Sequence, residues 1–339
     1  MTEGELHALA TNAFAGLGLP RRDAADAARI LVLGDLLGIR THGVSRIESY
    51  GERIDLGGIN ARADIRVERV APTIARVDGD NGVGPLVGMR ALEAAMAMAR
   101  ESGTGIAFAR NSNHFGAIGP YNLLAAEAGF ASIIGSNATT TIAPTGGRTA
   151  RLGNSPLGIG VPHPSGRPVI LDMAMSVVAR AKIREAQRRG ESIPDTWATD
   201  KEGRPTSDPA AALEGFLQPL GGYKGYGLAL IVDLFAGLLS GAAYLTHVQS
   251  WSEAPEKPQD LGHFFFLIDT RRLGTDDWLA ERMDDFAGIL HATPPVDPSK
   301  PVLLPGQLEL ERLEHGRSEG IAIEAGVRQT LERFAARAP

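Results

Sequence analysis

Apolar residues recur at helical spacing over the first part of the chain. Across residues 24–37 they return every three or four positions, and Pro20 precedes them as a helix-start signal. A helical period resumes through Arg46 and Tyr50, which are four residues apart and therefore share one face of a helix. We expect helices over residues 3–39, followed by a further helix that directs Arg46 and Tyr50 toward one ligand.

The pattern changes after residue 71. Residues 73–78 have the pattern of a strand, a glycine-rich loop follows, and residues 86–100 have the period of a helix rich in alanine and methionine. This is a strand–loop–helix unit, and further units follow it. Apolar runs of strand type lie at 105–109, 131–135, 168–172 and 264–268, with a helix near 121–128. We therefore expect an α/β or mixed α+β core, with strand direction left open.

The remaining segments differ in polarity. Residues 188–209 and 250–260 are rich in glycine, proline and charge, and each is expected to be an exposed connection. Residues 226–239 are apolar on nearly every side of a helix apart from Asp233, which indicates either the protein interior or a subunit interface. Residues 307–339 alternate charged and apolar positions and predict a final strand and helix.

Composition excludes several classes of function. The chain has 339 residues, enough for two or three domains, and a net charge of −6 without a dense basic cluster, so nucleic acid is not an expected partner. It lacks cysteine and metal-binding spacings such as H-E-x-x-H, so no metal site is predicted. No apolar run reaches the ~20 residues of a membrane span. The first residues lack the order of a signal peptide, so a cytoplasmic location is expected.

Two histidines carry the strongest chemical signal. His42 lies in the segment Thr41-His-Gly-Val-Ser-Arg46, and His114 lies among small and amide side chains in residues 111–119. Either histidine alone is more typical of a structural role. Together with Arg46 they predict acid–base chemistry on an anion, because imidazole exchanges a proton near neutral pH and guanidinium binds a carboxylate through two hydrogen bonds. Reduction of a 2-oxo acid needs this combination.

Three other segments are candidates for binding a nucleotide. The glycine loop before residue 86 does not fit the dinucleotide fingerprint, since Val87 stands where its third glycine belongs. Residues 221–227 hold four glycines around Lys224 before an apolar helix, which favours an anion-binding turn. Asp172 follows a predicted strand, where it either caps a helix beginning at Ser176 or binds ribose hydroxyls. Lys182, one turn further on, is equally consistent with a solvated surface.

These motifs together resemble a known family. The chain is similar to the malate/L-lactate dehydrogenase family of the type 2 kind, which also includes ureidoglycolate and sulfolactate dehydrogenases and piperideine-carboxylate reductase. The motifs that carry the resemblance are, in chain order, Thr41-His-Gly-Val-Ser-Arg46, Asn111-Ser-Asn-His-Phe-Gly116, Gly153-Asn-Ser-Pro156, Asp172-Met-Ala174, Gly221-Gly-Tyr-Lys-Gly-Tyr-Gly-Leu228 and Leu304-Pro-Gly306.

The resemblance implies an architecture. The fold would be α/β with a mixed central sheet of the L-sulfolactate dehydrogenase type, distinct from the Rossmann fold, and a helical domain formed by the chain ends. Residues 1–70 with 310–339 would form that helical, substrate-side domain. Residues 71–309 would form the NAD(P)-binding domain, with an inserted exposed segment near 185–215. A homodimer is also implied.

The resemblance also implies roles for individual residues. His114 would donate a proton to the substrate carbonyl oxygen, and His42 with Thr41, where the family usually has serine, would form a hydroxyl relay. Arg46 with Tyr50 would anchor the substrate carboxylate. Asn154 would also lie on the substrate side, and Lys182 would lie at the catalytic centre. The cofactor-binding set would be Asp172, Met173, Ala174, Lys224, Gly222, Asn137, Leu304, Pro305 and Gly306, with Gln307 replacing a family glutamate.

The function implied is hydride transfer between NAD or NADP and a small 2-oxo or 2-hydroxy acid. The choice between the two cofactors stays open, with Arg148, Arg151 and Arg180 as candidate partners of a 2′-phosphate. One alternative is a reductase of cyclic imino acids, which Lys182 disfavours because that branch tends to carry an acid there. An alternative of a different class is a hydrolase or lyase that uses His42 and His114 without a nicotinamide.

Overall fold

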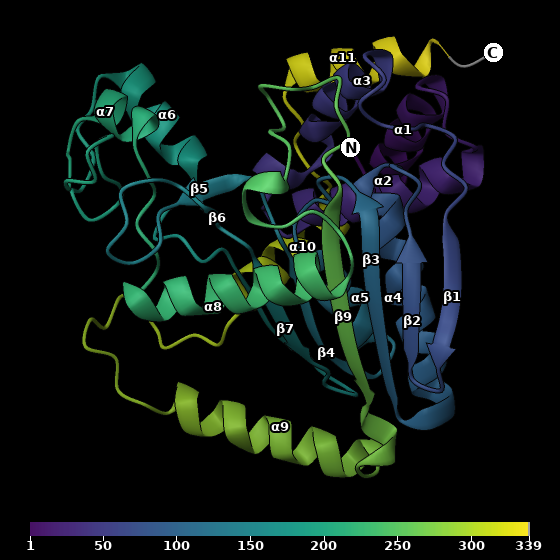
Figure 1. Ribbon diagram of the computed structural model, residues 1–339. Helices are drawn as coiled ribbons and strands as arrows, with labels where there is room; N and C mark the ends of the chain where they lie inside the picture. Colours follow the sequence, from purple (N-terminus) through teal and green to yellow (C-terminus); the bar gives the residue numbers. More distant parts are fainter. Residues whose placement is uncertain (338–339) are drawn as a thin grey trace.

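The computed structural model describes residues 1–337 and is built around one seven-stranded sheet (Figure 1). The strands lie in the order β1-β2-β3-β9-β4-β7-β8, and β2 and β3 run parallel while the other neighbours are antiparallel. The sheet is therefore mixed, as expected. The strand bounds are β1 Arg66–Ala71, β2 Ile74–Asp78, β3 Thr104–Ser112, β4 Phe130–Ser136, β7 Leu157–Val161, β8 Val169–Met173 and β9 Leu261–Asp269, with a separate hairpin of β5 Thr140–Ile142 and β6 Leu152–Gly153.

The strand β9 holds the sheet together. It pairs on one side with β3 and on the other with β4, so a segment near residue 265 joins two units that come much earlier in the chain. Its residues are nearly all buried, which matches the continuous apolar run of a central strand. This pairing places His263 opposite Ala109 on one side and Ser136 on the other, directly beneath the cavity described below.

Helices cover the two faces of the sheet unequally. On one face α4 (Gly84–Ser102) packs on β2, β3 and β9, and α5 (Gly119–Glu127) packs on β4 and β7. On the other face α8 (Tyr223–Asp233) and the π-helical turn η3 (Leu234–Leu239) cross in front of the strands (Figure 1). The helix α9 (Asp276–His291) lies below the sheet, and none of its residues is buried.

The two ends of the chain pack together. The helices α1 (Glu3–Gly16) and α2 (Arg21–Leu36) pack on each other, α11 (Ala325–Ala335) packs on α1 and α3 (Ile47–Asp55), and α10 (Gln307–Glu319) packs on α2. Their buried side chains belong to the same core cluster as those of the sheet and α4. The short turns η1 (Arg40–His42) and η2 (Val44–Arg46) connect α2 to α3.

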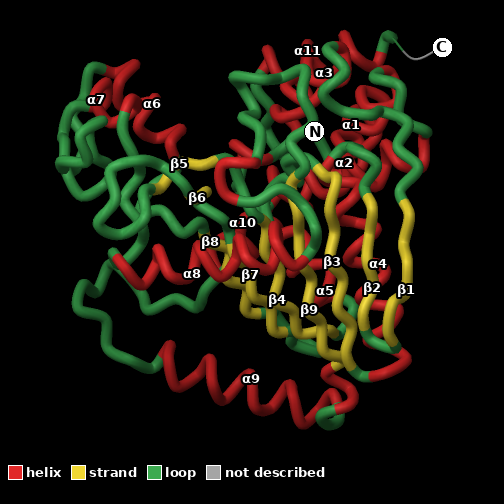
Figure 2. Tube along the Cα trace, in the orientation of Figure 1, coloured by secondary structure: helices red, strands yellow, loops and turns green. Residues whose placement is uncertain are grey.

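A small lobe stands apart from the sheet (Figure 2). It consists of α6 (Arg180–Arg189), α7 (Pro209–Glu214) and the segment between them. The sequence pattern predicted an exposed connection over 188–209, but this lobe has a core of its own, in which Ala198 is fully buried and Ile193 is 4% exposed. The apolar residues of that core are spaced irregularly among glycines and prolines, so no helical or strand period in the sequence indicates them.

Other predictions require correction. The final strand predicted within 307–339 is absent from the described part of that segment, where the structure has the helices α10 and α11 and residues 338 and 339 lie outside the description. The helix predicted at Ser176 begins at Arg180. The helix predicted over 226–239 is α8 with η3, and it is not fully interior, since Leu228, Ile231 and Leu238 are about half exposed, which leaves the subunit-interface alternative. None of the helices within residues 1–337 is long and apolar enough to cross a membrane.

Candidate active site

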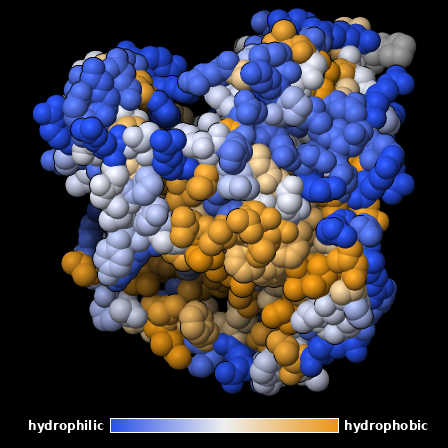
Figure 3. Space-filling view, viewed as in Figure 1, coloured by the Kyte–Doolittle hydropathy of each residue, from blue (hydrophilic) through white to orange (hydrophobic). Residues whose placement is uncertain are grey.

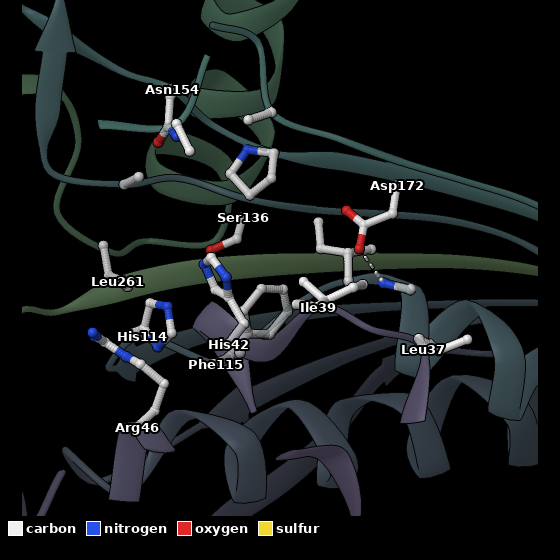
Figure 4. A pocket seen from close by; sticks show the side chains of 18 of the residues that line it. Leu37, Ile39, His42, Arg46, His114, Phe115, Ser136, Asn154, Asp172 and Leu261 are labelled. Carbon is white, nitrogen blue, oxygen red and sulfur yellow. Dashed lines mark hydrogen bonds between the residues drawn. The ribbon is translucent and has the colours of Figure 1, made fainter. Parts of the chain in front are cut away.

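A cavity of about 630 Å³ lies where the chain-end helices meet the sheet. Its walls come from the η1–η2 turns, the loop before α5, the end of β8, the start of α10 and the segment 251–261. Figure 4 shows that His42, His114 and Arg46 lie together at one end and Asp172 lies toward the other. The volume falls within the range of ~300–1,000 Å³ that is typical of small-molecule and cofactor sites.

The two predicted histidines meet in this cavity. The imidazole rings of His42 and His114 stack with centroids 5.3 Å apart and an interplanar angle of 27°. The Thr41 hydroxyl lies 3.0 Å from Nδ1 of His42, so a hydroxyl partner for this ring is present although threonine replaces serine. Burial, with a smaller contribution from the charge of Arg46, lowers the pKa of His42 to about 4 and holds that of His114 well below its usual value. Both rings are therefore neutral near pH 7.

A buried carboxylate sets the position of His42. The backbone N–H of Val44 donates to Oδ2 of Asp35 at 2.7 Å, and this bond closes the turn that follows the histidine. A Cβ atom on Gly43 would lie 2.1 Å from Oδ1 of Asp35, so only glycine fits between them. Burial raises the pKa of Asp35 to about 6. The glycine in Thr41-His-Gly-Val-Ser-Arg46 is thus explained by close packing against Asp35.

Arg46 is a cation without an anionic partner in the protein. Within residues 1–337 no carboxylate lies within ion-pair distance of its guanidinium, and its buried Nε atom has no hydrogen-bond acceptor. Its side chain lines the cavity and points toward His114 (Figure 4). A buried polar group normally has a partner, so this arrangement fits a site that receives the carboxylate of a ligand.

Tyr50 contacts His114 and not the cavity. Its side chain is fully buried, and its hydroxyl lies 2.7 Å from Nδ1 of His114 and donates to the backbone carbonyl of the same residue at 2.9 Å. Because the Tyr50 hydroxyl uses its hydrogen in the bond to the carbonyl, Nδ1 of His114 carries a hydrogen and donates it to the tyrosine oxygen. Nε2 of His114 then carries no hydrogen and can accept a proton. Direct anchoring of the substrate by Tyr50, as the helical spacing suggested, is not what this geometry provides.

The asparagines around His114 hold its loop in place. The side chain of Asn113 is buried and donates to the backbone carbonyl of Gly82 at 2.9 Å, and the backbone N–H of His114 donates to Oε1 of Gln259 at 3.0 Å. A Cβ atom on Gly84 would lie 2.1 Å from the carbonyl oxygen of His114. Gly84, the first residue of α4, therefore packs directly against the histidine loop, where a Cβ atom does not fit.

His263, at the start of β9, is a buried member of the site floor. It is fully buried, its ring nitrogens lie 2.8 Å from the hydroxyls of Ser112 and Ser136, and its ring stacks on Phe115 at 4.1 Å. Its partners come from β3 and β4, which are distant from it in the chain, so the local sequence does not indicate them. Burial lowers its pKa to about 3, so it is a neutral structural link beneath His114.

The opposite end of the cavity is formed by Asp172 and the start of α10. The Asp172 carboxylate lies on the cavity wall and accepts from the backbone N–H of Gly119 at 2.7 Å, so it caps α5 and not a helix at Ser176 (Figure 4). Burial raises the pKa of the Asp172 carboxyl group. Gly306, with a φ of 81°, precedes the first residue of α10, and together with Pro305 it lines the cavity. A helix N-terminus that opens into a cavity is suited to a phosphate.

Gln307, which stands where the resemblance implies a glutamate, leaves the turn at α10 intact. Oε1 of Gln307 accepts from the backbone N–H of Leu304 at 3.2 Å, and its amide nitrogen donates to Glu311. A glutamate would accept the same bond, so the change removes a charge at the helix N-terminus without removing the hydrogen bond. The turn that presents Pro305 and Gly306 is therefore preserved.

The cavity contains some of the predicted residues and not others. Of the residues predicted to bind substrate or cofactor, Asn137, Asn154 and Ala174 line the cavity. Met173 and Leu304, which were predicted to bind the cofactor, do not. The amide of Asn137 is already bonded within the protein, accepting from Gly262 N–H and donating to the carbonyl of Ala243.

The predicted basic residues lie mostly outside the cavity. Lys182 is on the exposed side of α6, while Arg184, half a turn later, lines the cavity. Lys224 is exposed at the start of α8, and Gly222 lines a second hollow of about 460 Å³ together with Arg148. Arg151 is exposed, and Arg180 donates to the carbonyl of Leu213. Within the described chain there is no cluster of three or more residues arranged to bind a metal.

The site also contains a residue that the sequence pattern did not indicate. Trp251 lies in the segment expected to be an exposed connection, yet it lines the cavity and its ring centroid is 5.6 Å from that of His114. A lone tryptophan among prolines and charges was the available signal, because a large aromatic side chain is seldom left fully in solvent.

Comparison with known proteins identifies the family of this chain. The profile of one family, described as malate/L-lactate dehydrogenase, matches residues 1–332. A malate dehydrogenase of Pyrococcus horikoshii is 42% identical over 261 residues, which cover 75% of this chain and 71% of that protein. A delta(1)-pyrroline-2-carboxylate reductase of Ancylobacter novellus is 34% identical and covers 98% and 96%. The solved sulfolactate dehydrogenase of Methanocaldococcus jannaschii is similar with a TM-score of 0.91 and 32% identity, over 100% of this chain and 97% of that one.

Proposed function

We propose, from the premise that this chain belongs to the malate/L-lactate dehydrogenase family, that it transfers a hydride between NAD or NADP and a small 2-oxo or 2-hydroxy acid. The observation that carries the proposal is Arg46, a cavity-lining cation without a counter-ion among residues 1–337, placed beside the neutral His114. One group binds a carboxylate, and the other exchanges a proton with the oxygen on the next carbon. These are the two recognition needs of a 2-hydroxy acid.

In the oxidising direction the protein supplies a base and an anchor. Arg46 binds the substrate carboxylate, and Nε2 of His114 accepts the proton of the 2-hydroxyl group as its carbon loses a hydride. Nδ1 of His114 keeps its hydrogen bond to Tyr50, which holds the ring in place as it becomes positively charged. The nicotinamide supplies only the hydride chemistry. In the reducing direction His114 returns the proton to the carbonyl oxygen.

The low pKa of His114 is compatible with this role because binding changes its surroundings. In the free protein the uncompensated charge of Arg46 contributes to lowering that pKa, after burial itself. A bound carboxylate neutralises Arg46 and removes that contribution, so the imidazole gains a proton more easily when substrate is present. Proton exchange is thereby linked to occupancy of the site.

The residues at the other end of the cavity fit a dinucleotide. The open N-terminus of α10 at Gly306 is suited to a phosphate, the wall formed by Ala174 and Pro305 is small and apolar, and Arg184 adds a positive charge. The proposal keeps residues 1–70 with 310–337 as the substrate side and 71–309 as the cofactor side. A cytoplasmic location is proposed with it, since cells keep nicotinamide dinucleotides inside.

A homodimer is part of the proposal, and its support is an apolar surface on α8 and α9. Leu228, Ile231 and Leu238 are 46–50% exposed along one face of α8 and η3, and Phe286 on α9 is 56% exposed (Figure 3). An isolated helix without buried residues has little to stabilise it in water, so α9 needs a packing partner. The change Ile231→Asp should shift the protein to monomers in analytical ultracentrifugation, while Val67→Asp on the edge strand should not.

A second candidate is reduction of cyclic imino acids, which the pyrroline-2-carboxylate reductase relative favours. The same arginine would bind the carboxylate, but the proton would go to nitrogen. Lys182 was expected to disfavour this reaction, and its exposed position on α6 weakens that argument.

The deciding experiment follows oxidation of NADH and of NADPH by absorbance, with a panel of 2-oxo acids and one cyclic imino acid. Turnover of an oxo acid is the expected outcome, and it also identifies the cofactor. Turnover of the imine alone would support the second candidate. If no compound is reduced by either cofactor, while a hydroxy or ester substrate is converted without nicotinamide, the proposal is wrong and a hydrolase or lyase takes its place.

A further inference from the structure

The segment Trp251–Gln259, called the capping segment from here on, closes the substrate end of the cavity. The cavity lining includes Trp251, Ser252 and Gln259 from this segment. The indole of Trp251 is 5.6 Å from the ring of His114 and meets Tyr50 edge-on at 5.4 Å. The guanidinium of Arg46 lies 5.3 Å from the centre of the same indole. One side chain therefore touches the proposed proton carrier and the proposed carboxylate anchor.

Arg53 fixes the capping segment from beneath. It is the largest fully buried side chain of the described protein, with 1% exposure, and no carboxylate forms an ion pair with it there. Its guanidinium donates to the carbonyls of Trp251 at 2.8 Å, Ala254 at 3.4 Å and Lys257. It also lies 4.6 Å from the centre of the Trp251 indole. Because its hydrogen-bond acceptors are main-chain carbonyls of one segment, the guanidinium of Arg53 fixes the position of that segment.

The two arginines are seven residues apart, so they project from the same face of the η2–α3 region. The indole of Trp251 lies against both guanidiniums, one reaching into the cavity and one buried. A Cβ atom on Gly58 would lie 2.0 Å from the carbonyl oxygen of Pro255, so the capping segment also sits tightly on the turn after α3. Its position relative to Arg46 is thus determined by α3.

We propose that Trp251 is the specificity-determining residue at the substrate end of the cavity, and that Arg53 is the positioning residue that holds it there. This inference rests on the proposed function. A carboxylate on Arg46 and a carbonyl oxygen near His114 orient C1 and C2 of a 2-oxo acid, and the group on C3 then meets the indole that touches both anchors. Trp251 limits the length of that group, so the preferred substrates are short 2-oxo acids.

The test compares Trp251→Ala, Trp251→Phe and the wild type on 2-oxo acids of increasing length, from pyruvate to 2-oxohexanoate. A methylene that fits or fails to fit an apolar pocket changes kcat/KM by about 10–200-fold. We expect Trp251→Ala to raise the ratio of kcat/KM for the longest acid over the shortest by at least about tenfold, with Trp251→Phe in between. Trp197→Phe, in the α6–α7 lobe, is the matched control and should leave the ratio unchanged. An unchanged ratio in Trp251→Ala would overturn the inference.

A second readout tests Arg53 and does not depend on turnover. In a background with Trp197→Phe and Trp278→Phe, fluorescence reports Trp251 alone. Arg53→Lys keeps the charge but cannot reach three carbonyls, so we expect acrylamide to quench Trp251 more strongly and the length preference to relax in the direction of Trp251→Ala. Unchanged quenching and preference would refute the positioning role.

Titration with oxamate, an unreactive analogue of a 2-oxo acid, distinguishes the proposed reaction from the proposed role of Trp251. A change in Trp251 emission without turnover of any oxo acid would remove the proposed reaction but keep the indole at an anion-binding site. Turnover by the wild type without any emission change on binding would keep the reaction and remove the role of Trp251.

Discussion

Removing the hydrogen bond between Tyr50 and His114 tests whether Tyr50 orients the histidine or contacts the substrate. In Tyr50→Phe the Nδ1–H group of His114 loses its acceptor in a buried position, and an unsatisfied buried donor costs about 1–3 kcal/mol. The loss is largest when the ring carries its positive charge, which happens in the transition state and not in the substrate complex. We therefore expect kcat to fall about 10–100-fold, with KM for the organic acid changed by less than about threefold, since ~1.4 kcal/mol is a factor of ten in rate.

The assay measures initial rates of nicotinamide oxidation with the organic acid varied at saturating cofactor. Tyr121→Phe is the matched control, because Tyr121 is equally buried and its hydroxyl donates to the carbonyl of Phe115 at 2.7 Å without touching His114. We expect this control to lose comparable stability in urea while its kcat stays within about threefold of the wild type. A raised KM with unchanged kcat in Tyr50→Phe would show that Tyr50 binds substrate directly, and the orienting role would be refuted.

Three further predictions concern the charged groups. Arg46→Gln should raise KM for the acid by about 100-fold or more. Because this change removes a charge that lowers the pKa of His114, the pH at which kcat/KM rises should move to a higher value. An unchanged pH profile would contradict the electrostatic coupling between Arg46 and His114. Burial raises the pKa of Asp35 from 3.8 to about 6, so the folded protein binds the extra proton and stability falls as pH rises from about 4 to 6. Asp35→Asn removes this dependence, and urea unfolding should show it gaining up to about 3 kcal/mol relative to the wild type between pH 4 and pH 8. Lys182→Ala should leave turnover unchanged, whereas Arg184→Ala should raise KM for the cofactor severalfold; the reverse result would restore the catalytic role expected for Lys182.

Local patterns predicted the elements that are regular and buried on a constant face. The helix at 86–100 and the strands at 105–109 and 131–135 are confirmed as α4, β3 and β4, because periodic apolar positions are enough to specify them. The order of the strands was not readable. The strand β9 lies between β3 and β4, a long-range pairing that no local period encodes.

The same distinction explains the site. His42, Arg46 and His114 were predictable because their chemistry is carried by residue type and by short motifs, and the cavity brings them together. The roles of Tyr50 and His263 were not, since each depends on a partner from another element, a histidine in one case and two serines in the other.

The capping segment shows most clearly that a residue's role can depend on partners from another element. Its prolines and charges predict exposure correctly for much of its length, while Trp251 and the buried Gln259 turn inward. Its position is determined by Arg53, whose three acceptors are main-chain carbonyls that look alike at every residue. An arginine buried without a carboxylate is visible only in the folded structure, but once seen it identifies the segment that it holds. Arg53 lies along the same helical face as Arg46, which has no ion-pair partner among residues 1–337, so the segment that Arg53 holds is the one expected to control substrate choice.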